Sequence, residues 1–173
     1  LQWMAQLVND MLYLAKADHG LLMPSREALD LGDEVDALLE FFTLLAEDAQ
    51  VTLVREGTAQ TMGDRGMLRR ALSNLLDNAL RFTPPGGEVR VRIKSGVTLT
   101  VENSGEGIPA SLLPRLFDRF YRADPSRRAG SSEHAGLGFA ITQSIVRAHG
   151  GRIYCESQAG WTRFVIELPK GDC

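Results

Sequence analysis

The stretch NLLDNALRF, residues 74–82, decides the fold because its polar and apolar positions separate onto two sides of a helix. At roughly 100° per residue, Asn74, Asn78 and Arg81 share one stripe. The apolar positions of this segment and of the residues just before it gather on the opposite side: Leu68, Leu72, Leu75, Ala79 and Phe82. The pattern predicts an amphipathic helix with an apolar side for the core and a polar side for solvent or a ligand.

Both ends of this helix are marked in the sequence. Asp64 is a favourable N-cap residue ahead of the first apolar position. Residues 83–87, TPPGG, cannot continue a helix because they contain two prolines and two glycines. We therefore predict a helix over residues 64–82.

The two amides, one helical turn apart, form a candidate metal site. An amide oxygen is a hard, neutral ligand suited to Mg²⁺, which completes its coordination with water and with substrate phosphates. Asn78, with Asn74 beside it, is the candidate ligand, and Arg81 one turn further on is placed to neutralise phosphates. Taken alone, Asn-x-x-x-Asn is more often the solvated face of an ordinary amphipathic helix. The pair indicates a site only in the company of other nucleotide-binding motifs.

A second motif follows in residues 97–109, VTLTVENSGEGIP, where an alternating apolar strand runs into a glycine loop. Gly105 and Gly107 permit positive φ angles and let a flat ring lie close to the backbone. Asn103, at the strand end, offers an acceptor and a donor that complement N6 and N1 of adenine. The same glycines also fit a plain turn after a hairpin strand.

A third motif, Gly136-Leu137-Gly138, opens an apolar helix, and free N–H groups at a helix start attract phosphate. Taken alone, a Gly-x-Gly is more often simply a flexible helix entry.

Between the glycine motifs, residues 116–122 (LFDRFYR) form an aromatic hinge, and the polar residues 124–134 after it are predicted to form a lid. Residues 115–128 contain five arginines and two aspartates, a local net charge of +3 in a chain whose formal net charge is -3. This local charge favours phosphates as a ligand over nucleic acid. A solvated charged loop is the alternative.

In this order, the motifs resemble the four nucleotide-binding boxes of sensor histidine kinases, whose fold is shared with the gyrase, heat-shock-90 chaperone and mismatch-repair ATPases. NLLDNALRF resembles the asparagine box, ENSGEG the first glycine box, LFDRFYR the phenylalanine box and HAGLGFAI the second glycine box. The likeness covers roughly residues 31–169 and includes the ending HGGRIYCESQAGWTRFVIELP. Within the family, VEN and LFDRFYRADPSR are similar to the heavy-metal-responsive sensor kinases.

The resemblance implies a site for ATP and Mg²⁺, with Asn78 as the metal ligand, Asn74 as a possible second one, and Asn74, Asn78 and Arg81 as catalytic residues. The implied nucleotide-binding residues are Asn74, Asn78, Arg81, Phe82, Asn103, Gly105, Gly107, Ile108, Arg119, Arg122, Gly136, Leu137 and Gly138. Two residues depart from the family pattern. Asn103 replaces an adenine-reading aspartate, which weakens the charge assistance to N6. His134 stands where the second glycine box usually begins with glycine.

The N-terminal segment has the three-four spacing of a bundle helix. Its seam consists of Leu1, Met4, Val8, Met11 and Ala15, flanked by Leu7 and Leu14. It resembles the second helix of a dimerisation and phosphoacceptor hairpin, so residues 1–22 are assigned to that hairpin and residues 23–173 to an ATP-binding catalytic domain. A helix packed on its own domain is the alternative. Neither His19, at the helix exit, nor His149, at the end of the helix after the second glycine box, is a candidate phosphoacceptor.

Composition agrees with one domain and a helical stub, because 173 residues can bury one sizeable core. The two cysteines have no metal-binding or disulfide spacing, and Cys155 in an alternating strand is expected to be a buried thiol. No apolar run has membrane-spanning length, and the leading leucine suggests a fragment. The resemblance to sensor histidine kinases implies the cytoplasmic domain of a bacterial inner-membrane sensor, without direct membrane contact of its own.

The order of elements favours a two-layer α/β sandwich with helices on one face of a mixed sheet, preceded by one bundle helix. Helices are predicted over residues 1–19, 32–49, 64–82 and 136–149, and strands over 26–30, 51–55, 59–62, 88–94, 97–103, 151–157 and 162–168.

The resemblance implies a protein-histidine kinase that transfers the γ-phosphoryl group of ATP to a histidine on an acceptor helix not present in this sequence. Expected partners are that helix, from the same or a sister subunit of a homodimer, and a response-regulator receiver domain, but not nucleic acid. An ATPase or ATP-gated clamp of the same fold, a serine-phosphorylating anti-sigma or switch-protein kinase, and a nucleotide-binding module without catalysis are the alternatives.

Overall fold

The computed structural model describes residues 2–121, 136–158 and 160–170. Its helices are α1 (Gln2–Asp18), α2 (Leu31–Ala49), α3 (Arg65–Phe82) and α4 (Gly138–Ala148), with a 3₁₀ turn at Leu113–Arg115. Its strands are β1 (Glu27–Asp30), β2 (Thr52–Glu56), β3 (Gln60–Gly63), β4 (Glu88–Lys94), β5 (Thr98–Ser104), β6 (Arg152–Gln158) and β7 (Trp161–Glu167). Every predicted helix and strand is present, with ends within two residues of the predicted ones, so the element predictions are confirmed.

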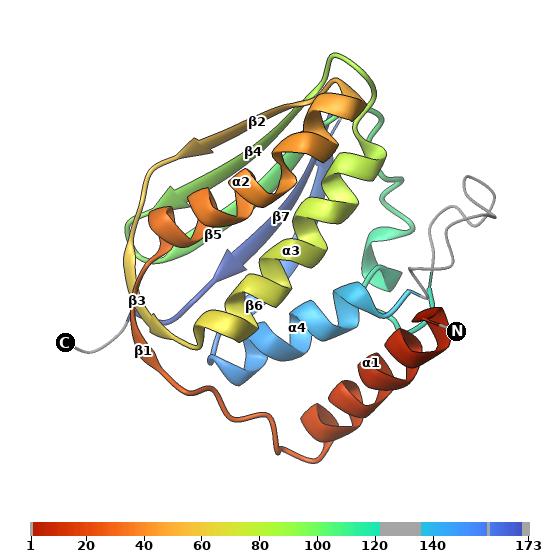
Figure 1. The fold of residues 1–173 in the computed structure, drawn as a ribbon. Helices are drawn as coiled ribbons and strands as arrows, with labels where there is room; N and C mark the ends of the chain where they lie inside the picture. The colour runs from red at the N-terminus through yellow and green to blue at the C-terminus, as the bar shows by residue number, and fades with distance from the viewer. Residues whose placement is uncertain (1, 122–135, 159, 171–173) are drawn as a thin grey trace.

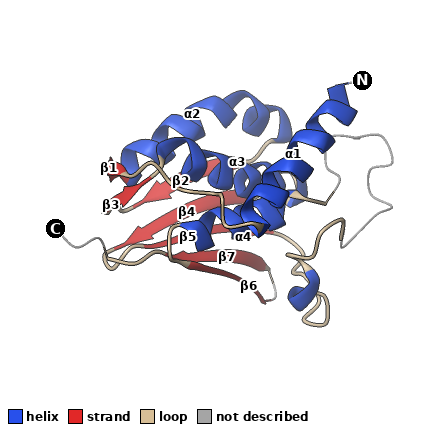
Figure 2. Cartoon of the chain, turned by 90° about the horizontal axis from the view of Figure 1, so that it is seen from below, coloured by secondary structure: helices blue, strands red, loops and turns tan. Residues whose placement is uncertain are grey.

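Five strands form a mixed sheet in the order β2-β4-β5-β7-β6. The β2–β4 pair is parallel and the other pairs are antiparallel. Strands β1 and β3 form a separate antiparallel pair. Helices α2, α3 and α4 lie on one face of the large sheet and leave its other face uncovered (Figures 1 and 2). The predicted two-layer sandwich is confirmed.

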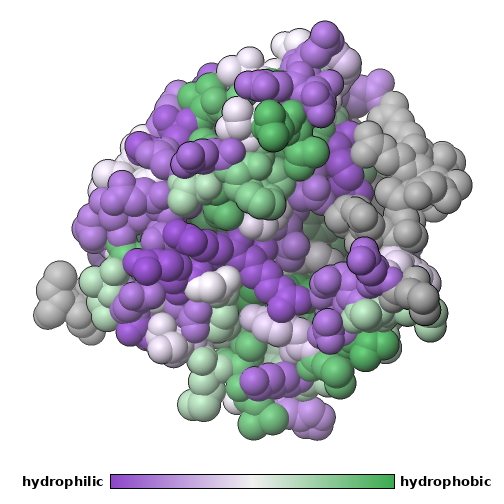
Figure 3. All heavy atoms as spheres, viewed as in Figure 1, coloured by the Kyte–Doolittle hydropathy of each residue, from purple (hydrophilic) through white to green (hydrophobic). Residues whose placement is uncertain are grey.

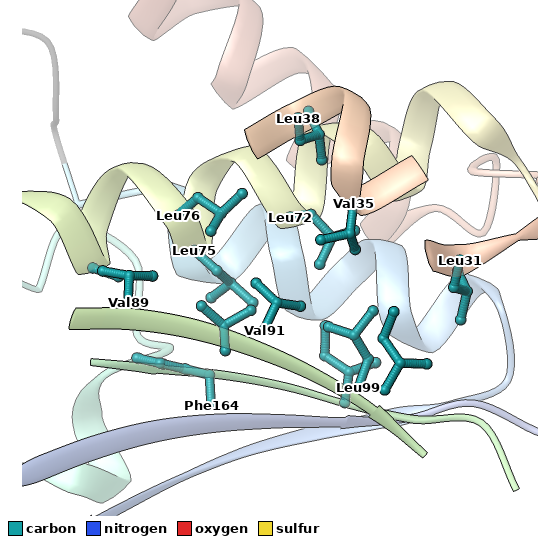
Figure 4. Close-up of a cluster of buried hydrophobic side chains, with 14 of the residues drawn as sticks. Leu31, Val35, Leu38, Leu72, Leu75, Leu76, Val89, Val91, Leu99 and Phe164 are labelled. Carbon is teal, nitrogen blue, oxygen red and sulfur yellow. The ribbon is translucent and has the colours of Figure 1, made fainter. Parts of the chain in front are cut away.

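The core lies between α3 and the covered face of the sheet. Leu75 and Leu76 on α3 are no more than 1% exposed, as are Val89 and Val91 on β4. Figure 4 shows the α3 leucines directed toward these strand residues, with Phe164 of β7 close by. Burying a side chain of this size contributes about 1.5–3 kcal/mol. This packing fixes which side of α3 is left for the polar stripe.

On the uncovered face of the sheet, side chains of alternating charge form a row across the strands. Arg90 pairs across the strands with Glu102, Glu102 with Arg163, and Arg163 with Glu156. The Glu102 carboxylate is 2% exposed, and it lies 3.1 Å from the Arg92 Nε and 3.1 Å from the Arg163 Nη2. Oppositely charged neighbours across strands stabilise a sheet. This face therefore needs no second layer of helices.

Helix α1 packs on its own domain along one side, which is the alternative considered for it. Leu14 is buried, and Leu7 is half-buried, both packing in a cluster with residues of α3 and α4. The Asp10 carboxylate accepts a 2.8 Å hydrogen bond from the Arg70 guanidinium of α3. The predicted seam, represented by Met4 and Val8, is more than half exposed. One side of α1 thus packs on the domain and the seam side does not.

One prediction for α3 is wrong. Phe82 was grouped with the apolar side of the helix, but it is 43% exposed. The last turn of α3 ends at Thr83, whose hydroxyl donates to the Ala79 carbonyl at 2.6 Å, and the chain then turns away. In the part of the chain that the structure describes, no helix is long and apolar enough to span a membrane.

Candidate functional site

Helix α3 holds its two asparagine side chains on the side away from the core. Its first turn is fixed by hydrogen bonds, and its apolar side is buried. The Asp64 Oδ1 accepts a 3.0 Å hydrogen bond from the Met67 N–H, which confirms the predicted N-cap. The Asp64 Oδ2 accepts from the Ser25 N–H at 2.9 Å and holds the linker from α1. These hydrogen bonds from backbone N–H groups lower the pKa of the Asp64 carboxyl.

Asn74 joins the asparagine motif to the second glycine motif. Its Nδ2 donates to the Gly138 carbonyl at 3.2 Å and lies 3.4 Å from the Thr142 Oγ1. Both partners belong to the first turns of α4. Residues 64 positions apart in the sequence therefore meet at the N-terminal end of α4. Leu137 is buried, so only the backbone is left to face a ligand at this helix start.

Asn78 and Arg81 continue the polar stripe of α3. The Asn78 side chain is half-buried, and it has no hydrogen-bond partner within residues 2–121, 136–158 and 160–170. The Arg81 Nε lies 3.4 Å from the Asp77 Oδ2, and the Arg81 guanidinium lies 5.8 Å from the centre of the Phe82 ring. The polar stripe thus ends in the Arg81 guanidinium, which is held in place by Asp77 and Phe82.

Asn103 lies at the end of β5 on the covered face of the sheet. It is 5% exposed, and its Nδ2 donates to the Ser104 carbonyl at 3.2 Å, which leaves the second N–H and the carbonyl oxygen. Thr162 of β7 is paired directly with Asn103 and is 4% exposed. Directly paired residues of antiparallel strands have their side chains on the same face. Thr162 therefore stands beside the amide proposed for adenine.

No motif in the sequence pointed to Thr162. Its relation to Asn103 depends on the register between two strands about sixty residues apart, and local periodicity does not define that register. The Ser157 Oγ links both parts, since it lies 3.3 Å from the Thr162 Oγ1 and accepts a 2.7 Å hydrogen bond from the Ile108 N–H. The first glycine loop is thereby tied to β6.

The loop glycines make close contacts with the protein itself. A Cβ on Gly107 would lie 2.6 Å from the Ser157 Oγ and 3.0 Å from the Gln158 carbonyl oxygen. Gly105 has a φ of 135°, which side chains rarely permit. The requirement for glycine at both positions follows from the packing of the loop.

The residues just before and just after the predicted lid, called the lid base here, contact each other. The Phe120 N–H donates to the Gly136 carbonyl at 3.0 Å. Gly136 has a φ of 80°, and a Cβ there would lie 2.8 Å from the Phe120 carbonyl carbon. The Phe117 ring packs edge-on against Phe139 of α4 and Phe164 of β7. Phe117 and Phe120, which precede the predicted lid, are therefore joined to Gly136 and α4, which follow it.

Of the two lid arginines, one is described. The Arg119 Nη2 donates to the Asp18 carboxylate at the end of α1 at 2.6 Å. Arg122, His134 and the predicted lid over residues 124–134 lie outside the described residues.

Two titratable side chains near the core are occupied by structural contacts. The His149 Nε2 accepts from the Asp64 N–H at 3.0 Å, and the Nδ1 lies 2.8 Å from the Ile145 carbonyl oxygen. Since the first partner only donates and the second only accepts, the ring is neutral with its proton on Nδ1. Burial lowers the His149 pKa. Burial raises the pKa of the half-buried Cys155 thiol to about 12, so this thiol is unreactive.

Metal binding by acidic, histidine or cysteine side chains finds no support among the described residues, where no group of three such side chains is close enough to hold an ion. A divalent cation at this site would depend on the asparagine amides and on oxygens from its ligand.

A family model described as histidine kinase-, DNA gyrase B- and HSP90-like ATPase matches residues 63–172. The chain is 52% identical over 171 residues to the sensor histidine kinase CusS of Escherichia coli O157:H7, and 42% identical over 177 residues to the probable sensor kinase SilS of Salmonella typhimurium. Each comparison covers 96% of this chain but only 35% of the relative's length. The chain therefore corresponds to about a third of these relatives.

Solved structures of histidine kinases have the same fold. The Acinetobacter baumannii histidine kinase AdeS superimposes with a TM-score of 0.80 over 97% of this chain and 79% of its own, at 23% identity. A mycobacterial sensor histidine kinase, MprB, superimposes with a TM-score of 0.71 over 83% of this chain and 97% of its own, at 33% identity.

Proposed function

The chain belongs to the family of histidine kinase-, DNA gyrase B- and HSP90-like ATPases, as a catalytic domain of the sensor histidine kinase type, and we propose that it is the phosphoryl-donor half of such a kinase. In the proposed reaction, the bond between the γ-phosphorus of ATP and its bridging oxygen breaks, a bond to a histidine nitrogen forms, and ADP leaves. The histidine is carried by another helix. The observation that supports this most strongly is the hydrogen bond between Asn74 and the Gly138 carbonyl, because it brings two nucleotide-binding motifs into one place.

The residues present fit a Mg²⁺ ion that arrives with the nucleotide. Asn78 offers an amide oxygen that no described residue uses, and Asn74 turns its Nδ2 toward α4, which leaves its own Oδ1 for a ligand. Such neutral oxygens complement an ion that takes most of its ligands from phosphate and water. When bound, the ion supplies charge neutralisation on the phosphate oxygens.

Adenine is assigned to the end of β5. The carbonyl oxygen of Asn103 would accept from N6, and its remaining N–H would donate to N1. The Thr162 hydroxyl, on the same face, would hold a water or accept directly from the base. Gly105, Gly107 and Ile108 would form the wall beside the ring, held in place by Ser157.

The phosphates are assigned to Gly136, Leu137 and Gly138 at the start of α4, because the first N–H groups of a helix have no partner within it and attract anions. Arg81 and Phe82 would border this region from α3, and Arg119 with Arg122 would approach it from the lid. Phosphoryl transfer asks mainly for positioning and charge neutralisation, which these groups provide without a covalent role for the protein.

Residue 74 argues against hydrolysis as the main activity. ATPases of this fold usually carry a glutamate at this position as the base that activates water. The amide of Asn74 cannot take a proton, and its N–H groups are already directed to α4. An ATPase or a nucleotide-binding module without kinase activity remains the second candidate, since Asn103 departs from the family's aspartate.

The whole protein is proposed to be a homodimeric sensor anchored in a bacterial inner membrane, with this domain in the cytoplasm. The exposed seam of α1 would pack in the dimerisation hairpin, the hairpin of the same or the sister subunit would supply the acceptor histidine, and a response-regulator receiver domain would take the phosphoryl group. Likeness to heavy-metal-responsive kinases supports a role in metal response.

Nucleotide titration by calorimetry tests the proposed site. We expect ATP to bind more tightly with Mg²⁺ than with EDTA, and more tightly than GTP in either buffer. Asn78→Ala should remove the effect of Mg²⁺, whereas Asn9→Ala, an exposed amide on α1, should leave it unchanged. Equal curves for wild type and Asn78→Ala would mean that the metal site is misassigned.

A further inference from the structure

Thr142 is a fully buried hydroxyl between the two helices that border the proposed site. It lies on α4 with a relative exposure of 0%. Its Oγ1 is 2.9 Å from the Gly138 carbonyl oxygen, 3.5 Å from the Ala71 carbonyl oxygen of α3 and 3.4 Å from the Asn74 Nδ2. Four polar groups from α3 and α4 therefore meet at one point. Asn74 and Gly138 belong to the residues assigned to the nucleotide, whereas Thr142 and Ala71 do not.

The partners determine which way the Asn74 amide points. The Gly138 carbonyl can only accept, so the Asn74 atom 3.2 Å from it must be the amide nitrogen. The Thr142 hydroxyl has the Gly138 carbonyl as its nearest acceptor, which leaves its lone pairs to accept from the second N–H of Asn74. Both N–H groups of Asn74 are then directed to α4, and the Oδ1 must point away from α4.

We propose that Thr142 is a positioning residue for the phosphate and metal site, because its hydroxyl fixes the Asn74 amide with the carbonyl oxygen turned outward. The inference rests on the proposed function, since it assigns the orientation of a ligand in that site. Thr142 does not contact the nucleotide itself, because it is buried beneath the first turn of α4.

The role follows from what the amide could do without the hydroxyl. An asparagine side chain rotates about its last bond among broad, nearly equivalent positions. Without the hydroxyl, the Gly138 carbonyl would hold only one N–H of the Asn74 amide. The amide could then rotate, and its Oδ1 would move, while that single hydrogen bond is roughly kept. Groups that orient a metal ligand typically change metal affinity or activity by 10- to 100-fold when they are removed. Asn74 is a second ligand beside Asn78, so the expected effect is near the lower limit.

The test compares Thr142→Val, which keeps the volume and shape of the side chain but removes the hydroxyl, with Thr142→Ser, which keeps the hydroxyl. Affinity for ADP is measured by calorimetry in Mg²⁺ and in EDTA. Thr142→Val should lower the affinity in Mg²⁺ by about tenfold, leave the affinity in EDTA within about twofold of wild type, and Thr142→Ser should restore the wild-type value. Unchanged Mg²⁺ dependence in Thr142→Val, an equal loss in both buffers, or no rescue by serine would overturn the inference.

A second measurement needs no bound ligand. The two side-chain N–H protons of Asn74 should give separate NMR signals that exchange slowly with water in wild type and in Thr142→Ser. They should exchange faster in Thr142→Val. Equal exchange rates in all three proteins would show that the hydroxyl does not hold the amide.

Asn78→Ala, titrated in parallel, separates the inference from the proposed function. If Asn78→Ala retains the effect of Mg²⁺, the proposed metal site fails and the inference fails with it. If Asn78→Ala loses the effect while Thr142→Val keeps it, the site stands and only the positioning role of Thr142 is refuted.

Discussion

Asp64 connects three parts of the chain through its side chain and backbone. Its carboxylate caps α3 and holds Ser25, and its N–H donates to the ring of His149 at the end of α4. Asp64→Ala should lower the free energy of unfolding by about 0.5–2 kcal/mol, because the N-cap bond is lost. Urea denaturation measures this. Asp48→Ala, an exposed carboxylate at the other end of a helix, should change it by less than about 0.5 kcal/mol. Equal losses in both variants would contradict the assigned role of the cap.

His149 makes stability depend on pH in a definite direction. The folded state keeps the ring neutral and lowers its pKa, so the unfolded chain binds more protons as the pH falls below the ordinary value of about 6.5. The contribution of His149 is therefore complete above that value and is lost on acidification.

We predict that the free energy of unfolding falls between pH 7.5 and pH 5.5 by more in wild type than in His149→Asn. Urea denaturation at both pH values, with His19→Asn as the exposed control, measures the difference. Identical pH dependence in wild type and His149→Asn would show that the ring is not held neutral.

At the residue scale, the sequence was sufficient where a signal is local. The N-cap at Asp64 and the polar stripe of Asn74 and Asn78 follow from spacing along one helix. The bond from Asn74 to α4 and the pairing of Asn103 with Thr162 join positions about sixty residues apart. Such contacts depend on helix packing and strand register, which no local pattern contains. Phe82 was misplaced for the same reason, because its exposure depends on the tertiary packing around the last turn of α3.

Among the elements, α1 and the lid base are connected by one ion pair. Arg119 donates to Asp18 at 2.6 Å, and this carboxylate competes with a phosphate for the same guanidinium. Asp18→Asn should therefore raise the affinity for ATP, by at most about fivefold because exposed ion pairs are weak. Asp10→Asn, which loses a pair with Arg70 away from the lid, is the matched control. Calorimetry measures the ATP affinity of both variants. If Asp10→Asn raises the affinity as much as Asp18→Asn, or if Asp18→Asn does not raise it, Arg119 is not shared between Asp18 and the nucleotide.

The helices and strands themselves were predictable because their ends carry strong signals. The N-cap of α3, the TPPGG segment after it and the alternation in β4 and β5 define elements within a few residues. Their arrangement was only partly predictable. The separate β1–β3 pair and the parallel pairing of β2 with β4 arise from long-range contacts that alternation does not specify.

Over the described part of the molecule, most of the exposed large apolar side chains lie on helices α1 and α2. Figure 3 shows hydrophobic surface over α2 and over α1, and Phe41 and Leu44 of α2 are more than 70% exposed. The opposite sheet face carries the row of alternating charges around Glu102. This asymmetry agrees with a catalytic domain that meets its partner helices on one side only.

The most direct test of the whole account is phosphoryl transfer to a separate acceptor. The chain is incubated with Mg²⁺ and ATP labelled in the γ-phosphate, alone and with a phosphoacceptor hairpin from a sensor kinase such as CusS. The account predicts acid-labile phosphohistidine on the hairpin, none on this chain, and loss of transfer in Asn78→Ala. Stable phosphohistidine on this chain alone, or release of free phosphate with no label on the hairpin, would contradict it.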